Sequence, residues 1–184
     1  MASDLKGQVV KYLQDAFGME EQSIQILTKA VKIAGDPDLS QLYRGHLNDS
    51  RDHQRYVKQR LEDLGESESK VKQHVQRATA LGLGIGAQAM PDTPGKVAAV
   101  AFAFEHLEIA SYEMLRNVAA EAGDNLTVEM TERILPVERQ AAQLIERNFE
   151  LAARRSLSAV GVDISPDAGT EGVGTREAES RGWS

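Results

Sequence analysis

The sequence predicts an all-α protein, an antiparallel four-helix bundle with one long crossover between its second and third helices. Apolar residues recur at steps of three and four along four long segments, which is the periodicity of amphipathic helices. Glycine turns separate the first segment from the second and the third from the fourth, whereas residues 66–93 separate the second from the third. Two tight hairpins joined by a long link indicate a single-crossover bundle, because an up-down-up-down bundle needs only short loops.

The first predicted hairpin joins a helix over residues 3–34 to a helix over residues 36–64. Gly35 supplies the left-handed conformation that commonly ends a helix. Asp36 then caps the second helix, and Pro37 suits its first position because proline lacks the N–H that would be unsatisfied there.

The second predicted hairpin follows the crossover. Residues 66–93 can form one short extra helix before glycines and a proline break the pattern. The Thr-Pro pair at 93–94 repeats the cap signature and opens a third helix over residues 94–123. A fourth helix is predicted over residues 124–156, with Pro136 inside it as the expected site of a kink or bulge.

The predicted bundle occupies residues 1–160. After this point the composition turns to glycine, serine and acidic residues, with too few apolar side chains to offset the entropy of ordering the chain. Residues 161–184 are therefore predicted to be a disordered tail.

Composition excludes several classes of function. The net charge is -7 and aromatic residues are scattered, so no nucleic-acid partner is expected. The chain has no cysteine, which rules out thiolate chemistry and disulfides. Because the N-terminal segment lacks the apolar core of a signal peptide and no segment reaches the ~20 apolar residues of a membrane span, a cytoplasmic location without membrane contact is expected.

Every predicted helix carries polar residues on its apolar face. These polar residues occupy positions of the apolar stripe, three or four residues from its neighbouring members on each side. Taken alone, each is more simply explained as a solvated residue at the edge of a broad helix face. The residues in these positions are Glu20, His46, Asp49, His53, Glu105, Glu108 and Glu138.

The acidic members of this set lie at one height along the bundle. At about 1.5 Å per residue, Glu20 and residues 49–53 lie roughly 20–25 Å from the turn that joins the first two helices. Glu105, Glu108 and Glu138 lie roughly 21–29 Å from the second turn by the same rise. Acids from all four helices are therefore expected to meet in the middle of the core.

Five carboxylates in an apolar core need neutralisation, because burying an unpaired carboxylate costs at least several kcal/mol. Two divalent cations would bring +4 against the -5 of these acids, and oxygen-rich sites with one or two imidazoles suit iron or manganese. The alternative is that the acids share protons and have raised pKa values, as crowded like charges do.

Four blocks of the chain resemble the YciE/YciF-like branch of the ferritin-like superfamily. They are DAFGMEEQ (15–22), HLNDSRDHQRYVKQRLEDLG (46–65), EHLEIASYEML (105–115) and LPVERQAA (135–142). The resemblance covers residues 5–158 and implies a ferritin-like four-helix bundle.

The resemblance also implies a site for two divalent metal ions, iron first and manganese as the alternative. In ferritin-like di-iron proteins, a Glu from each of two helices joins a Glu-x-x-His pair from each of the others. Here Asp49 stands where the second helix should carry Glu, and His53 follows it by four residues instead of three. No histidine follows Glu138, and His46 is expected to be a ligand or a hydrogen-bond donor to one.

Two functions of different classes remain open at this point. The first is an oxidoreductase of the ferroxidase or peroxidase type, in which ferrous ions react with oxygen or peroxide in a stress response. The second is a non-catalytic, stress-related bundle that acts through protein partners and has no functional metal site. A homodimer or larger homo-oligomer is expected for either.

Overall fold

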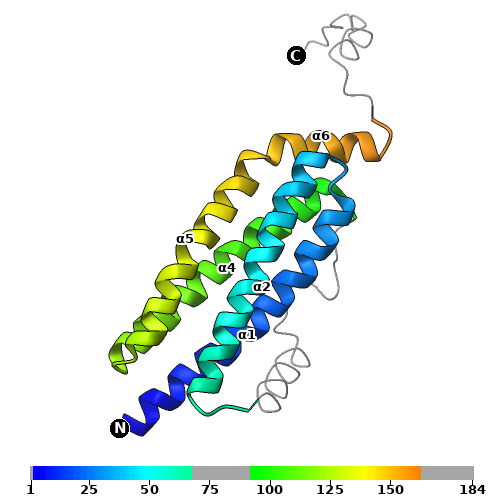
Figure 1. The fold of residues 1–184 in the computed structure, drawn as a ribbon. Helices are drawn as coiled ribbons and strands as arrows, with labels where there is room; N and C mark the ends of the chain where they lie inside the picture. Colours follow the sequence, from blue (N-terminus) through cyan, green and yellow to red (C-terminus); the bar gives the residue numbers. More distant parts are fainter. Residues whose placement is uncertain (1, 68–91, 163–184) are drawn as a thin grey trace, which may run out of the picture.

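The computed structural model describes residues 2–67 and 92–162, with side chains from residue 5 onward. This part of the chain forms helices and no strand (Figure 1), so the predicted all-α fold is confirmed. The helices are α1 (Ala2–Ile33), α2 (Pro37–Asp63), α4 (Pro94–Glu121), α5 (Asn125–Arg147) and α6 (Phe149–Ala159). The predicted extra helix of the crossover and almost all of the predicted tail lie outside the described residues.

Both hairpins turn at the predicted residues. Gly35 has φ +64°, in the left-handed region, and Asp36 then accepts hydrogen bonds from the backbone N–H groups of Asp38 and Leu39 at 2.9 and 3.3 Å. At the second turn Gly123 has φ +70°, and Asp124 accepts from the N–H of Thr127 at 3.2 Å. Local capping therefore fixes where each antiparallel pair turns.

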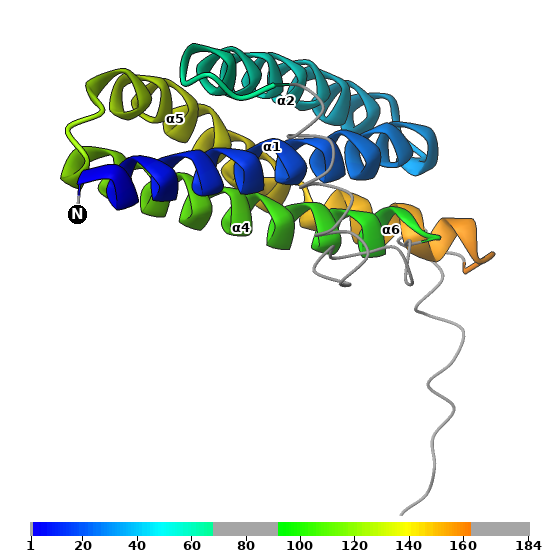
Figure 2. The ribbon, with the colours of Figure 1, turned by 90° about the horizontal axis from the view of Figure 1, so that it is seen from below.

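The helices form the expected single-crossover bundle. α1 packs against α2 and α4, and α5 packs against α4, as the two perpendicular views show (Figure 1, Figure 2). α2 and α4 run in the same direction, so α4 begins at the end of the bundle opposite to the end of α2. The fourth side of the bundle, between α2 and α5, is less closely packed than the other three.

The predicted fourth helix is wrong in one respect, because it is not continuous to residue 156. α5 runs through Pro136 and ends at Arg147, and the chain changes direction at Asn148, whose side-chain amide donates to the carbonyl of Leu144 at 2.8 Å. α6 then lies against the start of α4 (Figure 1). After the break, Ala152 packs with no exposed surface at this end of the core.

The apolar core consists of two clusters at different heights. One, around Leu27, Tyr43 and Phe104, lies toward α6, and the other, around Leu13 and Leu115, lies toward the opposite end. Polar side chains from α1, α2, α4 and α5 fill the level between the two clusters. The bundle therefore holds a polar layer in the middle of an apolar interior.

None of the described helices is both long enough and apolar enough to cross a membrane.

Candidate metal centre

The polar layer contains six residues from four helices. Each is buried, with 5% or less of its surface exposed. α1 contributes one carboxylate, α2 two imidazoles, α4 two carboxylates and α5 one carboxylate. The residues are Glu20, His46, His53, Glu105, Glu108 and Glu138, and they are referred to below as the central cluster.

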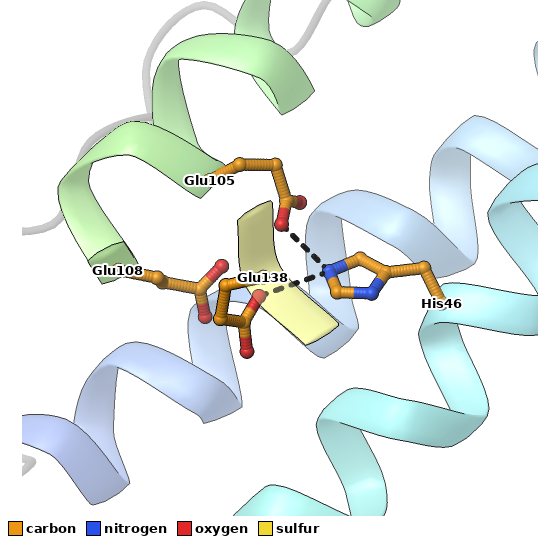
Figure 3. Close-up of side chains that lie close together, drawn as sticks. All are labelled: His46, Glu105, Glu108 and Glu138. Atoms are coloured by element: carbon orange, nitrogen blue, oxygen red, sulfur yellow. Dashed lines mark ion pairs between the residues drawn. The ribbon is translucent and has the colours of Figure 1, made fainter. Parts of the chain in front are cut away.

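The central cluster divides into two groups that share Glu138. In the first, His46, Glu105, Glu108 and Glu138 each direct one potential ligand atom to a common point, with these atoms within 4.8 Å of one another (Figure 3). In the second, Glu20, His53 and Glu138 meet the same criterion. Two groups of potential ligand atoms therefore lie side by side and have one carboxylate in common.

The two oxygens of Glu138 face different histidines. Its Oε1 lies 2.7 Å from Nδ1 of His53, and its Oε2 lies 3.4 Å from Nε2 of His46. His46 Nε2 also lies 2.7 Å from Oε2 of Glu105, and His53 Nδ1 lies 3.6 Å from Oε1 of Glu20. This is the arrangement in which a carboxylate can bridge two ions, one oxygen to each.

Most polar atoms of the central cluster lack a hydrogen-bond partner. Among the described residues, every fully buried side-chain nitrogen or oxygen without a hydrogen bond belongs to this cluster. The close nitrogen–oxygen contacts above are not aligned as hydrogen bonds. Because buried polar groups are normally satisfied, these unpaired atoms gathered at one place form a set of donors that a cation could satisfy. The atoms are Glu20 Oε2, His46 Nδ1 and Nε2, His53 Nδ1, Glu105 Oε2, Glu108 Oε1 and both carboxylate oxygens of Glu138.

Hydroxyl groups hold the other oxygens of two of these acids. Tyr112 donates to Oε1 of Glu20 at 2.5 Å, and Ser23 donates to Oε2 of Glu108 at 3.2 Å. Ser50 lies beside Ser23, with their hydroxyl oxygens 3.4 Å apart, and donates to the carbonyl of His46 at 3.1 Å. Each acid thus has one oxygen fixed by the protein and one left free. Ser23 and Glu108 lie far apart in the sequence, so no local pattern predicts this role for Ser23.

Burial and mutual repulsion shift the protonation of the carboxylates. Burial raises the pKa of Glu105 to about 7 and raises the pKa values of Glu20 and Glu108 above their ordinary value. Glu138 and the other acids of the cluster add to these increases by charge repulsion. Without a cation, therefore, the cluster retains protons that free glutamates would lose.

For the two histidines, burial and neighbouring charge act on the pKa in opposite directions, and the neighbouring charges together have the larger effect. Burial by itself would lower their pKa values, but the neighbouring carboxylates outweigh it, raising the pKa of His46 to about 10 and that of His53 to about 9. The main partners are Asp49 and Glu105 for His46, and Glu138 and Glu20 for His53. In the metal-free protein both imidazoles are therefore cationic at neutral pH.

Comparison with known proteins now decides the family. Residues 6–158 match the family model described as a domain of unknown function, DUF892. The chain belongs to this family. The YciE/YciF-like, ferritin-like resemblance expected from the sequence is confirmed by this match together with the solved structures below.

Three solved structures share the fold of this DUF892 chain. A protein from Xanthomonas campestris has 26% identity and a TM-score of 0.69, covering 85% of this chain and 98% of that one. The Escherichia coli stress protein YciF has 19% identity and a TM-score of 0.62, covering 82% and 98%. A two-domain protein from Anabaena variabilis with DJ-1/ThiJ/PfpI-like and ferritin-like domains has 18% identity and a TM-score of 0.60, covering 92% of this chain and 42% of that one.

One predicted site residue of this DUF892 chain does not join the central cluster. Asp49 is 51% exposed, and its Oδ2 lies 3.9 Å from Nδ1 of His46, on the side away from the other acids. Ser50, three residues before His53, occupies the inward position that the Glu-x-x-His pattern assigns to a carboxylate. The buried face of α2 passes through His46, Ser50 and His53, so Asp49 lies on its flank. The layer therefore contains four carboxylates instead of five.

Proposed function

We propose that this chain is a ferritin-like di-metal carboxylate protein that binds two divalent ions, iron first and manganese as the alternative. The observation that carries the proposal is the convergence of unpaired, buried ligand atoms from four carboxylates and two imidazoles. Oxygen-rich donor sets with imidazole suit these metals. Four carboxylates would also balance the +4 of two divalent ions, which the five acids expected from the sequence would not.

Each residue of the central cluster has a distinct place in this proposal. Glu138 would contribute to both positions, because its oxygens face different histidines. His46, Glu105 and Glu108 complete one position, and Glu20 and His53 complete the other. Iron in these positions would supply the capacity to exchange electrons with oxygen or peroxide, in the oxidation of ferrous iron or the removal of peroxide.

The surrounding residues prepare the cluster for this role. Tyr112 and Ser23 each fix one oxygen of an acid, so the free oxygen keeps its direction. The two apolar clusters above and below exclude water and strengthen electrostatic interactions at this level. His46 and His53 must lose their protons to become ligands, so uptake of metal releases protons to solvent.

A specific observation favours a second function. The pairs His46–Glu105 and His53–Glu138, each 2.7 Å apart, could neutralise much of the layer without metal. In that case the protein would be a non-catalytic bundle that acts through protein partners. A role in stress is suggested for either function by the fold that the chain shares with the Escherichia coli stress protein YciF.

Anaerobic titration of the metal-free protein with ferrous iron, followed by elemental analysis, separates the two functions. The di-metal proposal expects saturation at about two ions per chain, with a Glu138→Gln variant that binds far less. Addition of oxygen or hydrogen peroxide to the loaded protein should then oxidise the iron faster than the same iron free in buffer. Absence of saturable binding would leave the non-catalytic bundle as the function.

A further inference from the structure

A cleft of about 490 Å³ opens between α2 and α5, along the less closely packed side of the bundle. Its wall contains apolar side chains of α5, including Met130 and Ile134. At about 30 Å³ per water molecule, this volume has room for a hydrated ion. The cleft is thus large enough to hold a small hydrated solute.

One residue that lines the cleft, His53, also belongs to the central cluster. His53 lines the cleft and also faces Glu20 and Glu138 through its Nδ1. It is 4% exposed, whereas Glu20, Glu108 and Glu138 are 0% exposed. The cleft therefore reaches the edge of the cluster at His53, and the three fully buried acids lie behind this residue.

Carboxylates dominate the charged wall of the cleft. Four acids line it against two arginines, Arg60 and Arg133. Arg60 is already held by Asp124 at 2.7 Å and by Thr127 at 2.9 Å, so its guanidinium charge is largely compensated. The acids are Asp49, Asp52, Asp63 and Glu129, of which Asp52 pairs with Arg55 and Asp63 lies 3.8 Å from Arg60.

Two exposed acids of this wall lie on opposite sides of the cleft. Asp49 lies on α2, 3.9 Å from a ring nitrogen of His46 and four residues before His53, and Glu129 lies on α5 across the cleft. Four acids against two arginines leave the wall with an excess of negative charge, and such an excess raises the local concentration of cations and their association rate. The charge of this wall suits a cation.

We propose that the cleft between α2 and α5 is the access route by which a divalent cation reaches the central cluster, and that Asp49 and Glu129 attract it there. The inference rests on the proposed function, because it assumes that the cluster binds metal. It assigns Asp49 a role in the rate of metal uptake, in place of the ligand role expected from the sequence. The cation then passes from the acidic wall to His53.

The rate of Co²⁺ uptake tests the route, since bound cobalt is followed directly by its visible absorption. The metal-free Asp49→Asn/Glu129→Gln double variant should bind as many ions as the wild type but about tenfold more slowly at low ionic strength. Its uptake should also depend less on added salt, because salt screens the attraction that the variant has lost. Release to a chelator should also slow, because ions leave by the same route.

A matched control removes the same charge elsewhere. Glu21 and Glu146 are exposed and do not line the cleft, so the Glu21→Gln/Glu146→Gln variant should take up Co²⁺ at close to the wild-type rate. A second test narrows the cleft by Met130→Trp, which should slow uptake and release together while helicity is retained. The effect of this variant on uptake does not depend on the charge of the wall.

The outcomes separate the route from the proposed function. Full binding with unchanged uptake in both cleft variants would overturn the route and leave the metal site intact. A lower affinity or a missing ion in the Asp49 variant, with an unchanged association rate, would make Asp49 a ligand and overturn the route also. Absence of Co²⁺ and ferrous-iron binding by the wild type would overturn the proposed function, and the route with it.

Discussion

Tyr112 on α4 donates its hydroxyl hydrogen to Oε1 of Glu20 on α1 at 2.5 Å, with both side chains fully buried. The hydrogen bond occupies Oε1, the carboxylate oxygen that lies 3.6 Å from Nδ1 of His53, and leaves Oε2 of Glu20 without a partner. A tyrosine in this place can therefore orient a ligand without touching the metal.

Tyr112→Phe should weaken binding at the Glu20–His53 position while the fold persists. Loss of a partner that orients a metal ligand typically lowers affinity by about 10- to 100-fold. In a titration with Co²⁺, one of the two binding steps should need a higher Co²⁺ concentration than in the wild type, and the other step should be nearly unchanged. Tyr43→Phe is the control, because Tyr43 is equally buried in the apolar cluster near α6 but contacts no ligand. Equal affinities for the two variants would contradict the role given to Tyr112.

Glu138→Gln should reduce metal content more than Glu105→Gln. Glu138 belongs to both groups of ligands, whereas Glu105 belongs to one, and glutamine keeps the size of the side chain without its charge. Elemental analysis after loading should give about one ion per chain for Glu105→Gln and less than one for Glu138→Gln. Two ions retained by the Glu138 variant would show that this residue is not shared.

Uptake of metal at neutral pH should release at least about two protons per chain, because both histidines, and any carboxylate that still carries a proton, must be deprotonated to bind. The neighbouring carboxylates raise the pKa of His46 to about 10 and that of His53 to about 9, so both carry a proton before metal is added. A pH indicator in weakly buffered solution measures the release. The count should fall when the starting pH is raised toward 10, and no release at pH 7 would mean that the histidines are neutral or do not bind.

Stability of the metal-free protein should decrease as pH rises. The pKa of Glu105 is about 7 in the folded state against an ordinary 4.5, so its stabilisation is present below about 4.5 and is lost as pH rises through 7. For His46 and His53 the ordinary pKa is 6.5, so their contribution is complete below that value and is lost as pH rises through about 9 and 10.

Bound metal should reverse this trend, because protons compete with cations for the same ligand atoms. Urea unfolding of metal-free and metal-loaded protein between pH 5 and 9 should therefore give free energies of unfolding that diverge as pH rises. Coincident values over the whole range would show that the layer neither binds metal nor retains protons.

Two glycines, one at the contact between α4 and α6 and one on α2, should respond in opposite ways to substitution by alanine. A Cβ at Gly95 would lie 2.8 Å from Oγ of Ser156, which also accepts the N–H of Gly95, so Gly95→Ala should destabilise the fold by about 1–2 kcal/mol. Gly45, in the middle of α2, has no atom near such a Cβ, and Gly45→Ala should stabilise by about 0.5–1 kcal/mol. Denaturant unfolding measures both, and removal of the Ser156 hydroxyl should suppress the penalty at Gly95.

Much of the fold was predictable from the sequence because its determinants are local. Asp36 and Thr93 cap the helices that follow them, and Gly35 and Gly123 end the helices before them, each through bonds or conformations within a few residues. The height of the central cluster was predictable for a similar reason, since the rise of a helix per residue is fixed.

The remaining features depend on packing between distant segments. Whether Asp49 or Ser50 faces inward depends on a small rotation of α2, which neighbouring helices determine. The break at Asn148 follows from the packing of Ala152 against the bundle, which no local pattern encodes. The bond from Ser23 to Glu108 joins residues far apart in the sequence, so only the assembled bundle shows it.

Because the core is divided into two apolar clusters, the residues that hold the helices together differ from those of the central cluster. Each cluster joins all the long helices by itself, so the polar level between them is not needed to hold the bundle together. Buried ionic groups can often be replaced by apolar residues of similar volume without loss of stability. A variant with leucine or methionine throughout the central cluster would then have one uninterrupted core. Such an inert scaffold would be a reference protein for redesign, into which donor atoms for other metals could be introduced one at a time.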